Sequence, residues 1–329
     1  MRELKIEAHE AGQRLDKYLQ KYMAQAPKSF FYKMLRKKNI TCNQKKCDGS
    51  ERLMEGDIIR LFLSEETIEG FRKPKEAAAF YSENPLSVVY EDAHVLLLNK
   101  PAGILSQKAE KEDVSMVEYL ISYLLEKGEV TEESLRSFRP SVCNRLDRNT
   151  SGLITAGKTL QGSKELSALI RERNVKKYYL CLVDGIIKEN ARIHGWLLKD
   201  ESSNQVKIYR DKREGASEIY TAYEPLSHGK DLTLLKAELI TGRSHQIRAH
   251  LASIGHPVIG DSKYGKPSAN RKFRNAYHLE YQLLHAYCME FPKLSGVLSG
   301  LSRKQIFAPL PEIFEKILKD EKIERKGIV

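Results

Sequence analysis

Residues 144–153 carry the sequence NRLDRNTSGL, in which Asp147 stands between two arginines. Permanent cations beside a carboxylate favour its charged form, so we expect Asp147 to be ionised at neutral pH and available as a nucleophile or base. Thr-Ser-Gly at 150–152 is typical of a turn, and the apolar residues that follow predict a strand. The carboxylate is therefore expected on a loop at a sheet edge, a common place for catalytic groups. An ordinary surface ion pair is the alternative that the triplet leaves open.

The composition indicates a folded protein with a polyanionic partner. The 329 residues are enough for one or two domains, and the five cysteines include no Cys-x-x-Cys pair, so neither a disulfide framework nor a zinc site is expected. The net charge is +11, and residues 1–64 hold fourteen Lys and Arg against eight Asp and Glu. Clustered cations displace counterions from a nucleic-acid backbone. No apolar run reaches roughly 20 residues and no leader pattern is seen, so we expect a cytoplasmic protein without membrane contact.

The amino-terminal residues predict a small basic module. Apolar spacing predicts a helix over 14–23 and a second helix capped by Ser29, followed by strands at 40–43 and 57–63. The solvent side of the second helix carries the cations Lys33, Arg36 and Lys37. Such a platform could bind folded RNA through phosphate contacts, although a charged helix face is usually just solvated. We interpret 1–64 as an RNA-binding domain and 65–85 as a polar linker.

Residues 86–329 predict a second, larger domain. Helices and short strands are interspersed, and there is no Gly-rich phosphate loop or repeat, which favours a mixed, largely antiparallel α+β sheet with flanking helices. Strands are expected at 86–92, 95–100, 176–183, 191–197, 205–210, 217–225 and 231–240, and helices at 113–126, 163–173, 244–254 and after 311.

Two further side chains are candidate partners of Asp147. Tyr179 lies in a predicted strand and offers a flat ring on which a base can stack, although a strand tyrosine is more often part of the core. Arg248 borders the apolar stripe of the 244–254 helix, where it needs a carboxylate partner, and Asp147 is the natural candidate. The histidines His245, His250 and His256 lack metal-ligand spacing, so we expect them to face solvent or RNA and assign no metal.

The residues around Asp147 closely resemble the catalytic signature of RluA-type pseudouridine synthases, although that family usually has histidine where this chain has Asn144. The sequences VKKYYLCLVDG at 175–185 and TGRSHQIRAHL at 241–251 resemble the second and third elements of the same family. Residues 12–64 resemble the RNA-binding domain named after ribosomal protein S four. The resemblance spans nearly the whole chain.

This resemblance implies isomerisation of uridine to pseudouridine in RNA, with no cofactor and no metal. It assigns catalytic roles to Asp147 as the essential residue, Tyr179 as the stacking ring and Arg248 as the partner of the aspartate. Arg145 is implied to fill the space left by the flipped base, and Leu284 to pack beside the target ring. Substrate contacts are also expected from Lys100 and Arg243, although an exposed strand-end lysine without function is as plausible for Lys100.

Several alternatives stay open at this point. Among RNAs, large-subunit ribosomal RNA is favoured by the separate amino-terminal platform, with transfer RNA second, and a monomer is expected. A glycoside hydrolase would need a second acid, for which Asp261 is the one loop acid to nominate, and the basic surroundings argue against it. A non-catalytic RNA-binding or ribosome-assembly protein is the third class. Retention of every function by an Asp147→Asn variant would support this last reading.

Overall fold

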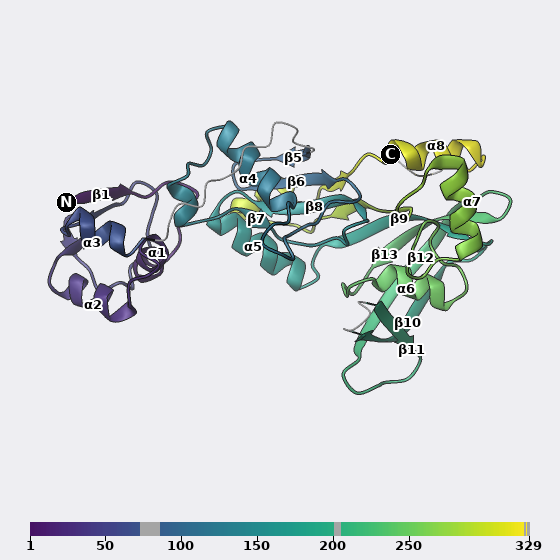
Figure 1. Ribbon diagram of the computed structural model, residues 1–329, viewed down its shortest axis with the longest axis horizontal. Helices are drawn as coiled ribbons and strands as arrows, with labels where there is room; N and C mark the ends of the chain where they lie inside the picture. The colour runs from purple at the N-terminus through teal and green to yellow at the C-terminus, as the bar shows by residue number, and fades with distance from the viewer. Residues whose placement is uncertain (73–85, 201–204, 326, 328–329) are drawn as a thin grey trace.

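The computed structural model describes residues 1–72, 86–200, 205–325 and 327, which form two parts side by side along the longest axis (Figure 1). The amino-terminal part is small and lies at one end of the molecule. Its elements are β1 (Arg2–Lys5), α1 (Leu15–Tyr22), α2 (Lys28–Arg36), β2 (Ile40–Cys42), β3 (Lys45–Lys46), β4 (Ile58–Leu61) and α3 (Glu65–Gly70). The strands make one sheet in the order β1-β4-β2-β3, with α1 and α2 packed over its buried side chains.

The amino-terminal part is larger than the sequence predicted. Residues 65–70 were expected in a linker, but Ser64 caps helix α3 by accepting a hydrogen bond from Thr67 N, and Ile68 is buried in the same core as Leu15. The linker prediction is therefore wrong for these residues, and the remainder, 73–85, lies outside the described residues. Helix α2 begins at Lys28 after Pro27, so Ser29 lies in its first turn rather than at its cap.

The larger part is built on one sheet, which holds eleven strands in the described residues. Its strands are β5 (Ser87–Glu91), β6 (Val95–Lys100), β7 (Ser141–Val142), β8 (Ser151–Gly157), β9 (Lys176–Asp184), β10 (Ala191–Asp200), β11 (Gln205–Tyr209), β12 (Ser217–His228), β13 (Leu232–Leu239), β14 (Leu284–Glu290) and β15 (Gln305–Phe307). The main path runs β11-β10-β12-β13-β9-β14-β8-β6-β5, and among these named strands the β14-β8 pair alone is parallel. The predicted mixed, largely antiparallel α+β fold is confirmed.

Helices cover both faces of this sheet. They are α4 (Met116–Glu126), η1 (Ser134–Arg136), α5 (Leu160–Arg171), α6 (Gln246–Ser253), α7 (Pro267–Tyr277), η2 (Gly296–Leu301) and α8 (Glu312–Asp320). Side chains of β9 alternate between the two faces, so Tyr179 packs with Ile247 of α6, whereas Leu182 packs with Phe314 of α8. The face that carries Tyr179 is thus the face that α6 covers.

Two helices differ from their predicted limits. Helix α5 starts at Leu160 rather than at 163, because Thr159 caps it by accepting a hydrogen bond from Gly162 N. Helix α6 is shorter than 244–254. His245 before it has a left-handed backbone with φ of 57°, and Ile254 after it is 37% exposed rather than buried.

The two parts of the molecule meet through polar contacts. Leu160 N donates a hydrogen bond to His9 O at 3.0 Å, and Ser137 Oγ donates to the Glu10 carboxylate. Arg72, at the end of the amino-terminal part, pairs with Glu133. Among the described residues, no helix has the length and apolar character needed to cross a membrane.

Because two histidines are buried in the structure, we expect the free energy of unfolding to fall in mild acid. His285 Nδ1 lies 2.9 Å from Ser151 Oγ and His250 Nδ1 lies 2.8 Å from Thr221 Oγ1, and neither histidine is exposed. Burial lowers the pKa of each from 6.5 to about 4. The unfolded chain therefore binds more protons between pH 4 and 6.5, so the free energy of unfolding falls as the pH drops through this window. We expect each histidine to contribute about 2 kcal/mol to this loss between pH 7 and pH 5.

Urea unfolding at pH 7, 6 and 5 measures this dependence. The variant His285→Asn removes one titrating group and should show a shallower fall in stability than the parent protein. Equal free energies of unfolding at pH 7 and pH 5 in the parent protein would contradict the prediction.

Candidate active site

Asp147 lies on the loop between β7 and β8, and hydrogen bonds to its two neighbours fix this loop. On one side, Ser106 Oγ accepts a hydrogen bond from Leu146 N at 3.0 Å and donates one to Leu146 O at 2.9 Å. On the other side, Arg148 O accepts hydrogen bonds from Lys100 Nζ at 2.9 Å and from Gly103 N at 3.0 Å. The direction of the Asp147 side chain is therefore set by backbone contacts on both sides of it.

Strand β8 holds the ends of the same loop. Asn144 Oδ1 accepts hydrogen bonds from Thr155 N at 2.7 Å and from Thr155 Oγ1 at 2.9 Å. Gly152 has φ of 109° and lies so close to β14 that an added Cβ would be 2.3 Å from Ala286 O. The glycine that follows Thr-Ser is thus required by its backbone angle and by the close approach of a neighbouring strand.

Arg248 joins Asp147 to a second carboxylate beneath the site. Its Nη1 donates to Asp147 Oδ2 at 2.9 Å, while Nε and Nη2 donate to Asp261 Oδ2 and Oδ1 at 2.7 and 2.8 Å. Arg248 is 4% exposed and Asp261 is not exposed. Burial disfavours the charge on Arg248, but Asp261 and Asp147 together raise its pKa above the ordinary value. Asp261 thus holds the guanidinium with one nitrogen directed at Asp147.

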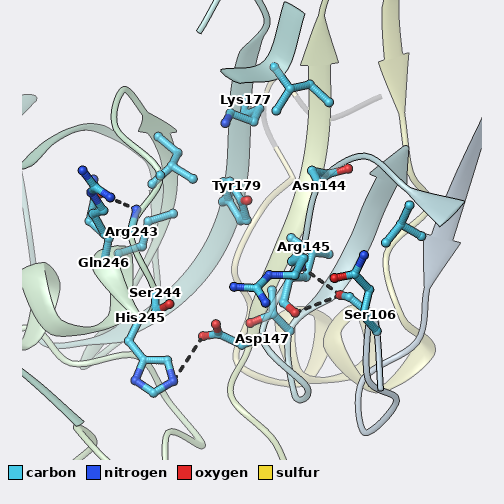
Figure 2. A pocket seen from close by; sticks show the side chains of 18 of the residues that line it. Ser106, Asn144, Arg145, Asp147, Lys177, Tyr179, Arg243, Ser244, His245 and Gln246 are labelled. Atoms are coloured by element: carbon cyan, nitrogen blue, oxygen red, sulfur yellow. Dashed lines mark hydrogen bonds and ion pairs between the residues drawn. The ribbon is translucent and has the colours of Figure 1, made fainter. Parts of the chain in front are cut away.

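His245 and Tyr264 complete the surroundings of the aspartate. His245 Nε2 lies 3.9 Å from Asp147 Oδ2, and its Nδ1 lies 3.0 Å from the Tyr264 hydroxyl (Figure 2). Burial lowers the pKa of His245, although Asp147 acts in the opposite direction. The Tyr264 ring lies 5.2 Å below the Arg248 guanidinium carbon, and its hydroxyl accepts a hydrogen bond from Val206 N. The arginine is therefore packed against a ring as well as paired with carboxylates.

A pocket of about 910 Å³ opens above this cluster. Tyr179 is 6% exposed and its hydroxyl points into the pocket between Asp147 and Lys177 (Figure 2). Burial and the Asp147 carboxylate both raise the pKa of Tyr179, so its phenol keeps its proton at neutral pH. The walls come from the 105–109 segment, the Asp147 loop, the end of α5, β9, the 242–248 segment and Leu284. The size is that of a small-molecule or nucleotide site.

Comparisons with known proteins identify the family of this chain. Residues 94–253 match the sequence profile described as RNA pseudouridylate synthase. The chain is 31% identical over 328 residues to ribosomal large subunit pseudouridine synthase C of Vibrio parahaemolyticus, covering 95% of this chain and 94% of that one. The chain belongs to the RNA pseudouridylate synthase family. It is therefore an RNA pseudouridine synthase, as its sequence motifs predicted.

Other relatives of the synthase agree with this assignment. Ribosomal large subunit pseudouridine synthase C of Escherichia coli strain K12 is 29% identical, covering 87% of each chain. The solved structure of human RNA pseudouridylate synthase domain containing 4 superposes with a TM-score of 0.58 and 19% identity, covering 73% of this chain and 95% of that one. At this identity the human structure shows a shared fold.

The predicted site residues of the synthase fall into three groups. The pocket is lined by six of them: Asp147, Tyr179, Arg248, Arg145, Arg243 and Leu284. Lys33 and Arg36 on α2 and Lys37 directly after it are exposed, lie in the amino-terminal part and do not line the pocket. Lys100 is the third case, because the structure places it inside the protein.

The position of Lys100 contradicts the expected contact with a substrate phosphate. Lys100 is 0% exposed, and its Nζ donates hydrogen bonds to the carbonyl oxygens of Pro101, Ile104 and Arg148 at 2.7 to 2.9 Å. Burial lowers the pKa of Lys100 to about 7. Its three donors are used to tie the end of β6 to the Asp147 loop, so Lys100 is a structural residue of the synthase.

The sequence reasoning missed several members of the site. Asp261 was considered as the loop acid that a glycoside hydrolase would need, but it is buried and bound to Arg248. Among the described residues that line the pocket, Asp147 is the single carboxylate, so this lining lacks the second acid of such an enzyme. His250 is buried rather than surface-exposed, and His256 Nδ1 lies 2.8 Å from Asp184 O. His245 contacts the aspartate. Ser106 and Tyr264 carried no motif signal of their own.

Ser106→Ala tests how strongly the loop position affects the reaction. The change leaves Leu146 N and O without their partner in a buried place, which should cost about 1–3 kcal/mol of stability. A small displacement of a catalytic group can cost up to about 10²-fold in rate, so we expect kcat for pseudouridine formation to fall by about 10- to 100-fold. Ser64→Ala, which removes the α3 cap far from the pocket, should lose similar stability without losing activity. Equal kcat in the two variants would show that Ser106 does not position Asp147.

Proposed function

We propose that this synthase converts uridine to pseudouridine in large-subunit ribosomal RNA, as a cytoplasmic monomer, with Asp147 as the essential residue. The RNA assignment rests on one observation: nearly full-length similarity to bacterial proteins named ribosomal large subunit pseudouridine synthase C. The cationic lining of the pocket fits a phosphodiester substrate. In the reaction, the bond from ribose C1′ to uracil N1 breaks, C1′ bonds to C5, the C5 hydrogen leaves as a proton, and N1 gains a proton.

The arrangement around Asp147 supports its proposed role in this reaction. Arg248 binds Asp147 Oδ2, and within the described residues the other carboxylate oxygen, Oδ1, has no hydrogen-bond partner, so it can reach the ribose or the ring in the pocket. The Tyr179 ring is proposed as the surface on which the detached uracil stacks, and Leu284 as the apolar contact beside it. Holding the ring close between cleavage and rejoining raises its effective concentration at C1′.

The target nucleotide has to leave its helix to enter the pocket. Arg145 is exposed at the rim, in the same loop as Asp147, and we propose that it occupies the space that the flipped base leaves (Figure 2). Arg243 is exposed on the facing rim and is proposed to contact the RNA backbone.

The amino-terminal part is proposed to be an RNA-binding domain of the type named after ribosomal protein S four. Lys33 and Arg36 of helix α2 and Lys37 at its carboxyl end are exposed to solvent, as RNA phosphate contacts require. The polar contacts to η1 and α5 would keep this surface in a fixed relation to the pocket.

Tritium release from RNA labelled at uracil C5 tests the proposed function. We expect the wild-type protein to release tritium from in vitro transcribed bacterial large-subunit ribosomal RNA, and not from transfer RNA transcripts. Release from transfer RNA alone would replace the ribosomal target with the second candidate. Absence of release from either RNA, with RNA binding retained, would favour a non-catalytic RNA-binding protein.

A further inference from the structure

One wall of the pocket holds cations without counterions. Among the described residues, Asp147 is the single carboxylate that lines the pocket, and it is paired with Arg248. The same pocket is lined by Arg171, Arg173 and Lys177. Their side chains make no ion pair or hydrogen bond with any residue that the structure describes. Unpaired charges grouped in a concave site are costly unless a ligand neutralises them.

The position of Lys177 shows on which side of Tyr179 these cations lie. Lys177 and Tyr179 are two residues apart on β9, so their side chains emerge on the same face, roughly 6–7 Å apart along the strand. Figure 2 shows Lys177 beyond Tyr179 on the side away from Asp147. Arg171 ends α5 and Arg173 follows it before β9 begins, so both lie in the same segment of chain that leads to Lys177. The cations therefore continue outward from the place proposed for the uracil ring.

The electrostatics of Lys177 favour a bound anion. Its side chain is partly buried, and burial together with the neighbouring Arg173 lowers the pKa of Lys177. Both effects work against the ammonium form of Lys177, so a nearby negative charge would stabilise that form. The negative charge of a phosphodiester at this place would offset the positive charges of Lys177 and Arg173, and its oxygens would accept hydrogen bonds from the amine of Lys177.

We propose that Lys177, with Arg173 and Arg171 beside it, forms an anion site that holds the RNA backbone phosphate adjacent to the target nucleotide. This proposal rests on the proposed function, because it assumes that the uridine occupies the Asp147 end of the pocket. The contact between Lys177 and this phosphate is equally strong in the complex with bound RNA and in the transition state. Loss of such a contact raises KM and leaves kcat unchanged.

Lys177→Met tests the site with the full-length protein and a transcript of bacterial large-subunit ribosomal RNA. Lys316→Met, at an exposed lysine of α8, is the matched control. We expect the slope of log Kd against log salt concentration to become shallower by about 0.7 to 0.9 in Lys177→Met, since one phosphate contact is lost. In tritium release, KM should rise about tenfold while kcat stays within about twofold. Lys177→Arg, which keeps the charge, should retain the wild-type slope.

Arg173→Gln is a second test of the anion site, at an exposed position where folding is not at risk. It should also make the slope of log Kd against log salt concentration shallower. Wild-type slopes in both Lys177→Met and Arg173→Gln would overturn the anion site. A large loss of kcat in Lys177→Met with an unchanged slope would also overturn it, because Lys177 would then act in the chemistry. If wild-type protein releases no tritium from any RNA, the proposed function fails, yet the salt slopes still decide whether the anion site exists.

Discussion

Asp147→Asn should reduce tritium release by about 10⁴-fold or more while RNA binding stays near the wild-type level. The amide has nearly the same shape as the carboxylate, but it can act neither as a nucleophile nor as a base, so the proposed chemistry loses its reacting group. The fold should tolerate the change, because Arg248 keeps both of its hydrogen bonds to Asp261. Single-turnover tritium release and filter binding on the same ribosomal RNA transcript separate the two effects.

Asp320→Asn is the matched control for this variant. Asp320 is an exposed aspartate at the end of α8, so its replacement changes the net charge by the same amount without touching the pocket. We expect wild-type kcat in this control. A residual rate in Asp147→Asn within about tenfold of wild type would remove Asp147 from the centre of the mechanism.

The Asp147–Arg248 pair could be anticipated from sequence because each partner lies in a distinctive local pattern. The aspartate stands between two arginines before a turn, and the arginine borders the apolar stripe of a predicted helix. A buried arginine needs a carboxylate, which is a rule about charge and not about a particular fold. The structure places the two groups 2.9 Å apart although they are 101 residues apart in the chain.

Asp261 and Lys100 show where sequence reasoning stopped. Lys100 ends a predicted strand and Asp261 lies in a predicted loop, and charged side chains are usually exposed at both kinds of place. Their burial depends on which segments close over them, the 241–264 region for Asp261 and the Asp147 loop for Lys100, and these contacts are set by the tertiary fold. Polar groups that stabilise a site from beneath leave no periodic signal, so the supporting residues were missed while the reacting residue was found.

Helix α3 illustrates a similar limit in the amino-terminal part. Its six residues are mostly charged or polar, and a single apolar residue, Ile68, enters the core. Periodicity needs several apolar positions before it indicates a helix face. The short helix is therefore recognised through its Ser64 cap and through its packing, and the packing is known from the structure alone.

Arg248→Met should abolish activity and lower the free energy of unfolding by about 3–5 kcal/mol. The substitution leaves Asp261 as a buried carboxylate that retains hydrogen bonds from Lys263 N at 2.9 Å and Tyr264 N at 3.1 Å but has lost its counterion. Those two backbone donors are the reason to expect the lower end of the range. Urea unfolding measures the stability, and tritium release measures the activity.

The double variant Arg248→Met with Asp261→Asn separates the two roles of the arginine. Neutralising Asp261 removes the stranded charge, so we expect the double variant to regain more than half of the stability that Arg248→Met loses. Activity should not return, because Asp147 still lacks its partner at 2.9 Å. If stability and activity recovered together, Arg248 would serve only to neutralise Asp261. The double variant could also regain neither stability nor activity. The stability lost in Arg248→Met would then come from the lost packing of the guanidinium against the Tyr264 ring, and not from the unpaired charge of Asp261.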